Sequence, residues 1–276
     1  MSERLGIEGL TVMGLPPVEF VGLAADLGCR NISLTIAQGP VNPWGYPAFD
    51  LAADVALRRE LGAALKDHGV SISLGEGFVL FPGVDARALA AGRFDAMLEL
   101  GVRRINVVSM GVELARTLDE FAVMAELATA AGFAQVVTEF APVFAVQDLA
   151  MALEAVRHVG RPNFKILVDT MHLARTGGTA ADLAALDPAL VGYVQLCDAP
   201  RVPVDPDYMH EAMYDRKTPG EGELPLFDML AALPRDLVVS VEIPQMAKAQ
   251  AGADARQIVT PIVEASRALL AKVAAA

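Results

Sequence analysis

Four polar side chains stand where apolar, β-branched runs of the sequence come to an end. Glu139 and Asp169 each close such a run, Gln195 lies within a third, and Glu242 closes a fourth. If the runs are parallel strands, their carboxyl ends meet at one face, and these side chains converge there. Three carboxylates and a carboxamide in one place would repel one another unless they were protonated or neutralised by a cation. The pattern therefore predicts a divalent metal ion held by all four residues.

The ligand types also indicate which metal is expected. Oxygen donors without a thiolate suit Mg²⁺ or Mn²⁺ better than Zn²⁺. We therefore expect Mg²⁺ or Mn²⁺, with Co²⁺ and Zn²⁺ as the alternatives. Taken singly, each strand-end side chain would otherwise be explained as a polar group that binds the amides of the following loop.

Further candidates lie in the segments that follow the apolar runs. His172 comes three residues after Asp169, so we expect it to contact the substrate or act in catalysis rather than merely cap a helix. An arginine above an anionic site would clamp a substrate carboxylate or phosphate, and we favour Arg216 over Arg201 for this role. Trp44, the only tryptophan, would either wall a substrate pocket or simply pack, and Glu76 is a further substrate-binding candidate.

The elements that must position these residues alternate regularly along the chain. Amphipathic stretches end at Gly28, Gly69, Gly101 and Gly132, and each is followed by a short β-branched run. This is typical of a helix ended by a left-handed glycine and followed by a buried strand. The expected strands are 7–13, 31–34, 70–74, 105–108, 135–137, 164–168, 191–196 and 237–241.

Eight strands alternating with about eight helices predict a parallel α/β fold, and eight is the number that closes a (β/α)8 TIM barrel. An open doubly wound sheet is the alternative, but it would favour a glycine-rich fingerprint after the first strand, and none is present.

No linker divides the chain, so we expect one domain over 1–276. The longest non-periodic stretches, about 37–50 and about 198–224, both follow strands and should lie at the catalytic face. The last helix should have Pro261 at its start or at a kink.

Composition excludes several classes of protein. The chain has 276 residues, 54% of them hydrophobic, which is enough for a sizeable core. Its net charge of −12 argues against binding to nucleic acid or to an anionic membrane surface. Two cysteines make no disulfide framework, and neither a secretory signal nor a spanning helix is recognisable. We therefore expect a cytoplasmic protein that acts on a small molecule.

Four motifs of the second half resemble those of the xylose isomerase-like TIM barrels. They are Val168-Asp169-Thr170-Met171-His172, Val194-Gln195-Leu196-Cys197-Asp198, Pro219-Gly220-Glu221-Gly222 and Val241-Glu242-Ile243-Pro244. The superfamily includes sugar-phosphate isomerases and epimerases, hydroxypyruvate isomerases, dehydroshikimate dehydratases and the AP endonuclease family 2 type. The resemblance implies a divalent metal on Glu139, Asp169, Gln195 and Glu242, and substrate contact by His172. Many members have histidine where this chain has Gln195, whereas hydroxypyruvate isomerases and some dehydroshikimate dehydratases carry glutamine. Family tendency suggests a homodimer.

The chemistry implied is proton transfer next to a carbonyl. A metal acting as Lewis acid would stabilise the enediolate formed when a hydroxy-ketone loses its α-proton, with Glu139 and Glu242 as acid and base. Reprotonation gives an isomerase or epimerase of a small sugar, sugar phosphate or hydroxy-keto acid, which is the leading hypothesis. Loss of a β-hydroxyl instead gives a dehydratase of a cyclic keto-acid or keto-inositol, and a non-catalytic binding barrel is a third reading. AP endonuclease chemistry needs several histidines, and the four present, together with a net charge of −12, argue against it.

Overall fold

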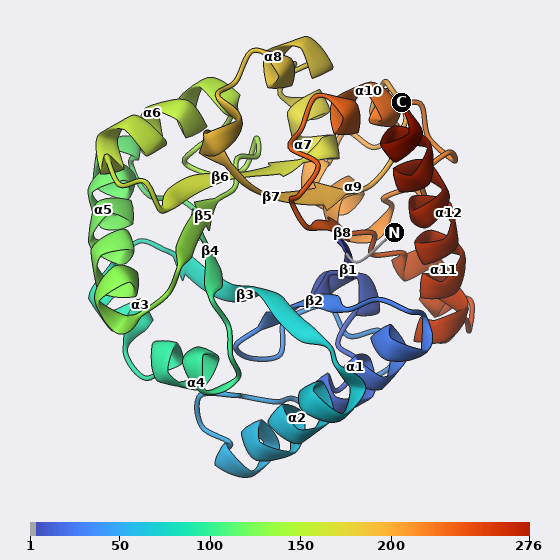
Figure 1. The fold of residues 1–276 in the computed structure, drawn as a ribbon, viewed down its shortest axis with the longest axis horizontal. Coiled ribbons are helices and arrows are strands. Elements are labelled where there is room, and N and C mark those ends of the chain that lie inside the picture. The colour runs from blue at the N-terminus through green and yellow to red at the C-terminus, as the bar shows by residue number, and fades with distance from the viewer. Residues whose placement is uncertain (1–3) are drawn as a thin grey trace.

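The computed structural model describes residues 4–276, and these form a closed barrel of eight parallel strands in the order of the chain, ringed by helices (Figure 1). This confirms the predicted TIM barrel. The strands are β1 (Leu5–Ile7), β2 (Asn31–Thr35), β3 (Ser71–Leu80), β4 (Arg104–Ser109), β5 (Gln135–Thr138), β6 (Phe164–Asp169), β7 (Val191–Leu196) and β8 (Val239–Val241).

Helices cover the outside of the barrel, and short ones also follow some strands. The α-helices of the first half are α1 (Pro17–Asp26), α2 (Val55–His68), α3 (Ala86–Ala90), α4 (Arg93–Glu99) and α5 (Leu114–Ala131). Those of the second half are α6 (Leu149–Val159), α7 (Thr170–Arg175), α8 (Ala180–Ala184), α9 (Tyr208–Tyr214), α10 (Leu226–Ala231), α11 (Met246–Gln250) and α12 (Ala255–Ala275). Two 3-10 helices complete the set, η1 (Gly9–Val12) and η2 (Pro188–Leu190). Among these described helices, none combines the length and apolarity needed to cross a membrane.

The glycine-ended helices explain why the units alternate. Gly69 ends α2 with φ 62° and Gly132 ends α5 with φ 108°, both in the left-handed region that a residue with a Cβ rarely adopts. Each returns the chain within a few residues to the next strand. Pro261 lies inside α12, past its first turn, rather than at its start.

Three strand predictions need correction. Residues 7–13 are not a strand, because β1 ends at Ile7 and η1 follows. Thr11 holds that turn, since its backbone N–H donates to the Glu8 carbonyl at 3.0 Å and its hydroxyl donates to the Val241 carbonyl at 2.7 Å. β3 extends to Leu80, six residues beyond the predicted end, and β8 begins two residues later than predicted. The remaining strands agree within one residue at each end.

Side chains fill the inside of the barrel, so the site can lie only at its mouth. A small cluster of Leu74, Val137, Leu167 and Tyr193 is fully buried and separate from the main core between strands and helices. The Tyr193 hydroxyl lies 3.0 Å from that of Ser73. Because β7 and β3 are not neighbours in the sheet, this contact crosses the interior of the barrel. The barrel is thus packed below the carboxyl ends of its strands.

Candidate active site and metal centre

Strand ends place the four predicted oxygen donors at the same end of the barrel. Glu139 is the first residue after β5 and Glu242 the first after β8, while Asp169 is the last residue of β6. Asp169 pairs in register with Gln195, and Gln195 pairs with Ser240. The four side chains therefore occupy neighbouring levels at the carboxyl edge, as the sequence pattern predicts.

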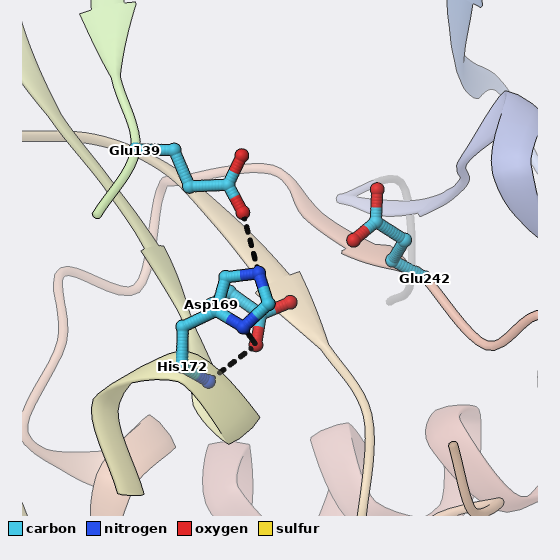
Figure 2. A group of neighbouring side chains, drawn as sticks. All are labelled: Glu139, Asp169, His172 and Glu242. Carbon is cyan, nitrogen blue, oxygen red and sulfur yellow. Dashed lines mark hydrogen bonds and ion pairs between the residues drawn. The ribbon is translucent and has the colours of Figure 1, made fainter. Parts of the chain in front are cut away.

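Four ionisable side chains come together there. Glu139, Asp169, His172 and Glu242 each offer one ligand atom, and these atoms lie within 4.8 Å of one another. Figure 2 shows Glu139 and Glu242 on opposite sides, with their carboxyl groups turned toward each other and with His172 and Asp169 beside the carboxyl group of Glu139. All four are buried. His172 thus stands among the candidate ligand groups, in addition to the substrate role expected for it.

The position of His172 follows from the start of α7. Asp169 caps this helix, and its Oδ1 accepts hydrogen bonds from the backbone N–H groups of Met171 at 2.8 Å and His172 at 2.9 Å. The imidazole Nε2 then lies 2.9 Å from Glu139 Oε1. Its Nδ1 is hydrogen-bonded to the hydroxyl of Tyr208, from α9. Both ring nitrogens are therefore engaged, which fixes the ring against Glu139.

Arg216 bridges two of the carboxylates. Its guanidinium contacts Asp169 Oδ2 at 2.5 Å and Glu242 Oε2 at 2.9 Å, and only 3% of the side chain is exposed. Burial alone would raise the pKa of Asp169, but the charges of Arg216 and His172 outweigh it and hold that pKa below its usual value. Although burial disfavours its charge, the two carboxylates raise the pKa of Arg216 well above its usual range. This arginine is therefore permanently charged within the site.

Gln195 is held by its amide nitrogen. Nε2 donates to Glu8 Oε2 at 3.3 Å and to Glu242 Oε1 at 3.1 Å. Its Oε1 is buried and has no hydrogen-bond partner among the described residues. Burial raises the pKa of Glu8, while hydrogen bonds from Ser240 and neighbouring groups oppose this rise. An unpartnered carbonyl oxygen in a polar site is costly unless a further group binds it.

Charge balance favours a cation here. Glu139, Asp169 and Glu242 bring three carboxyl groups, whereas Arg216 and His172 bring one guanidinium and one imidazole, so the acidic groups outnumber the basic ones. Burial, chiefly, raises the pKa of Glu242 well above its usual range, even though Arg216 opposes the shift. A divalent ion would neutralise the excess negative charge and displace the proton that Glu242 would otherwise hold. The carboxylates, the imidazole and the free oxygen of Gln195 fit such an ion, and an imidazole in the set also suits Zn²⁺.

A cavity of about 330 Å³ opens beside the carboxylates. Glu139, Glu242, Glu76 and Asn106 line its polar end. Asn106 Nδ2 lies 3.4 Å from Glu139 Oε2, and carboxylate oxygens of Glu76 and Glu242 fall within the same 4.8 Å limit. The remaining lining is largely apolar and comes from η1, α1, β2, the segment after β2, β3 and β4. The site therefore adjoins a space of the size that small-molecule pockets have.

The other predicted site residues lie in different places. Glu76 lines the cavity and accepts a hydrogen bond from the Ser33 hydroxyl at 2.8 Å. Trp44 is absent from the cavity lining, and its indole N–H donates to the Ala253 carbonyl at 3.0 Å. Arg201 is exposed in the segment after β7. The structure thus brings Glu76 to the site but not Trp44 or Arg201.

Three residues of the site were not foreseen. Glu8 directly follows β1, as Glu139 follows β5, but the misplaced first strand concealed it. Asn106 interrupts the apolar run of β4, and that polar interruption could have indicated it. Tyr208 belongs to α9, which lies within the stretch 198–224 that shows no helical period. Its contact with His172 could not be read from spacing.

Comparisons with known proteins agree with this architecture. A family model described as xylose isomerase-like TIM barrel matches residues 21–260. No curated protein gives a significant match. A xylose isomerase-like TIM barrel/4-hydroxyphenylpyruvate dioxygenase fusion protein is 20% identical with a TM-score of 0.76 over 96% of this chain, which spans only 42% of the fusion protein.

Other similar structures have nearly the length of this chain. The IolI protein with a bound zinc atom has a TM-score of 0.79 at 18% identity, with 98% of each chain covered. The probable 3-DHS dehydratase AsbF from Bacillus anthracis has a TM-score of 0.74 at 14% identity, over 96% of this chain and 98% of that one. An L-ribulose 3-epimerase has a TM-score of 0.71 at 17% identity, over 99% and 96%. At such identities the likeness establishes the fold, while the zinc and the reactions belong to those proteins.

Proposed function

The chain belongs to the xylose isomerase-like TIM barrel family, and from that premise we propose that it is a divalent-metal-dependent isomerase or epimerase of a small hydroxy-ketone, the class that includes sugars and hydroxy-keto acids. One observation carries the proposal. Glu139 and Glu242 face each other across the barrel mouth, and both line the same cavity (Figure 2). Two carboxyl groups on opposite sides of a substrate carbon are the arrangement that proton transfer requires.

Glu139 is held in place for that task. His172 Nε2 contacts one carboxyl oxygen at 2.9 Å, and Asn106 Nδ2 approaches the other at 3.4 Å. The Tyr208 hydroxyl on the far nitrogen of His172 completes the chain of hydrogen bonds. A carboxylate fixed in this way reaches an α-proton without first reorienting.

Glu242 is the second proton-transfer group. Gln195 binds its Oε1 at 3.1 Å and Arg216 binds its Oε2 at 2.9 Å, so its orientation is also fixed. Arg216 adds a positive charge beside the place where a substrate oxygen would gain negative charge. The metal, held by Glu139, Asp169, Gln195 and Glu242 with His172 adjacent, would supply Lewis-acid polarisation of the substrate carbonyl.

A dehydratase is the second candidate, and one contact favours it. Tyr208 presents a hydroxyl on the His172 imidazole, next to Glu139. Burial raises the pKa of Tyr208 above its usual value, so the hydroxyl keeps its proton and would reach a leaving oxygen by exchanging its bond to His172. Loss of a β-hydroxyl from a cyclic keto-acid would use the same first proton transfer from the α-carbon.

A metal-supplemented activity screen tests the proposal. Keto-sugars, hydroxypyruvate and dehydroshikimate would be incubated with the protein in deuterated water. An isomerase or epimerase incorporates solvent deuterium next to the carbonyl, whereas a dehydratase forms a new ultraviolet-absorbing enone or aromatic. Glu242→Gln should lower the rate by about 10²- to 10⁴-fold. Glu264→Gln, a matched change on the exposed face of α12, should have no effect. Full turnover by the Glu242 variant would refute the acid–base role.

Metal binding is measured separately. Metal at about 100 times its dissociation constant should stabilise the folded protein by about 2.7 kcal/mol, which a thermal melt detects. Asp169→Asn should weaken or remove that stabilisation. A protein that takes up no divalent metal, and whose melting temperature no metal changes, would point to the non-catalytic barrel instead.

A further inference from the structure

The cavity beside the carboxylates has one polar end and a long apolar remainder. Its polar end is the group Glu76, Asn106, Glu139 and Glu242 described above. The rest of the lining includes what we call the apolar wall, formed by Leu10, Met13, Phe20, Leu34, Phe49 and Phe78.

Most residues of the apolar wall belong to the main hydrophobic core of the barrel. Met13, Phe20 and Phe78 are at most 1% exposed, so the shape of the wall is fixed by packing on its far side. Met13 is also the one residue other than glycine, within the described chain, with a positive φ, at 45°. Such a conformation is strained, and strained residues gather at ligand sites where the surrounding structure holds them. The wall is therefore a preformed surface at the site.

No basic side chain of the described residues lines the cavity. The nearest guanidinium to the carboxylates, that of Arg216, is already bound by Asp169 and Glu242. Arg93, behind the end of β3, donates to the Gly77 carbonyl at 3.0 Å and is not part of the lining. A phosphate or carboxylate in the wall region would be desolvated without a counter-charge, which is strongly unfavourable.

A polyhydroxylated substrate chain would also bind poorly in the wall region. Apart from the polar end, Thr35 and Gln38 are the only polar side chains among the described lining residues. Hydroxyl groups held against the apolar wall would lose water and find few partners, chiefly Thr35 and the Oε1 of Gln38, which is unpaired within the described chain. Hydrocarbon held there would instead be removed from water, which is favourable.

We propose, on the basis of the function proposed above, that the substrate carries its hydroxy-ketone at one end and an uncharged hydrocarbon group, alkyl, alicyclic or aryl, at the other. The hydroxy-ketone lies between Glu139 and Glu242, and the apolar wall buries the hydrocarbon. This narrows the substrate class to compounds that are neither sugar phosphates nor sugars with a long polyol chain.

The experiment compares three probes with the metal-loaded protein. They are phenyl-substituted hydroxyacetone, erythrulose and dihydroxyacetone phosphate, and the readout is deuterium incorporation at the α-carbon. We expect kcat/KM for the phenyl compound to exceed the other two by at least about tenfold, the lower limit for one methylene in a fitted pocket. Equal or faster exchange of erythrulose or of the phosphate would overturn the proposal.

A pair of variants tests the wall itself. Phe49 is only half-buried, so Phe49→Asn should leave the fold intact while placing an amide in the wall. It should lower kcat/KM for the phenyl compound by about 10- to 200-fold and change that for erythrulose much less. Phe227→Asn, at a 40% exposed phenylalanine on α10 outside the cavity, is the matched control and should change neither. Equal losses for both substrates would count against the wall.

Failure of the proposed reaction has a separate signature. If no probe exchanges deuterium, the catalytic proposal fails, and equilibrium dialysis of the same three compounds then decides the substrate class. Binding of the phenyl compound alone, weakened by Phe49→Asn and not by Phe227→Asn, supports the wall. Binding of erythrulose or of the phosphate in preference, or of none, overturns it.

Discussion

The two halves of the barrel mouth hold their carboxyl groups with different kinds of partner. In the second half, Glu139 and Glu242 are bound by an imidazole and a guanidinium. In the first half, Glu76 is bound by a serine hydroxyl, and Glu8 by the hydroxyl of Tyr193 at 2.9 Å. A cationic partner such as Arg216 opposes the effect of burial on Glu242, although burial still raises the pKa of that carboxyl group, whereas a hydroxyl partner opposes burial more weakly. The second half is thus suited to proton transfer, whereas the first half serves to shape the site.

The largest effect should separate these two kinds of carboxyl group. Glu139→Gln removes a proton acceptor, and we expect kcat to fall by about 10²- to 10⁴-fold. Burial, together with the charge of Glu8, raises the pKa of Glu76 well above its usual range, and Glu76 contacts a serine hydroxyl rather than a cationic group, so an amide should replace it with little change in its surroundings. Glu76→Gln should therefore change kcat by less than about tenfold. Steady-state kinetics of the two variants measure this difference. Equal losses of kcat would show that the two carboxyl groups do not differ in role.

A second prediction concerns how the charged half is held together. Arg175 on α7 binds Glu211 on α9 through two contacts, of 2.8 Å and 2.6 Å, and both side chains are 5% exposed. Arg175→Ala leaves Glu211 buried without a partner, so the free energy of unfolding should fall by about 3–5 kcal/mol. Denaturant titration measures the loss. The double change Arg175→Met with Glu211→Leu should recover part of it, and a double variant as unstable as the single one would contradict this account.

A third prediction compares one hydroxyl from each half. Tyr208→Phe removes the hydrogen bond to His172, and we expect metal affinity or activity to fall by about 10- to 100-fold, as for other groups that orient metal-site histidines. Ser33→Ala removes the hydroxyl on Glu76 and should alter kcat little. Metal titration and initial rates distinguish the two, and equal effects would show that the hydroxyls serve the site alike.

The smallest effect concerns the two thiols. Burial raises the pKa of Cys29 to about 11 and that of Cys197 to about 12. Neither thiol should react with a disulfide reagent at neutral pH until the protein opens. Cys197 lies 3.5 Å from Arg216 Nη1, beneath the charged half. In Arg175→Ala, mass spectrometry should therefore find Cys197 labelled before Cys29, whereas simultaneous labelling would indicate global unfolding.

Local sequence patterns correctly predicted the fold and the strand-end carboxyl groups of the second half of the site, because both depend on short-range features. A glycine after each amphipathic stretch and a polar residue after each apolar run place Glu139, Asp169 and Glu242 correctly at strand ends. Glu8 obeys the same rule, but the apolar residues after it resemble a continued strand. The bond from the Thr11 hydroxyl to the Val241 carbonyl, which joins the two ends of the chain, helps to hold these residues in η1.

Long-range packing decided the rest. Tyr208 reaches His172 because Arg175 and Glu211 dock α9 against α7, and no spacing within 198–224 records that contact. The partners of Arg216 likewise depend on how the segment after β7 folds back. For Trp44 and Arg201 a substrate role stays a prediction, since the structure shows only that neither lines the cavity.

The ring of strands closes where the two ends of the chain meet. β1 pairs with β8 from Leu5 to Ile7, and Gly6 permits this approach because a Cβ there would meet the Ser240 hydroxyl at 2.9 Å. Glu8 and Glu242 stand immediately beyond this seam. Of the neighbouring strand pairs in the ring, this one closes the longest loop, so we expect it to form last during renaturation. Metal capture should thus appear only in the final kinetic phase, as a reporter of a completed ring.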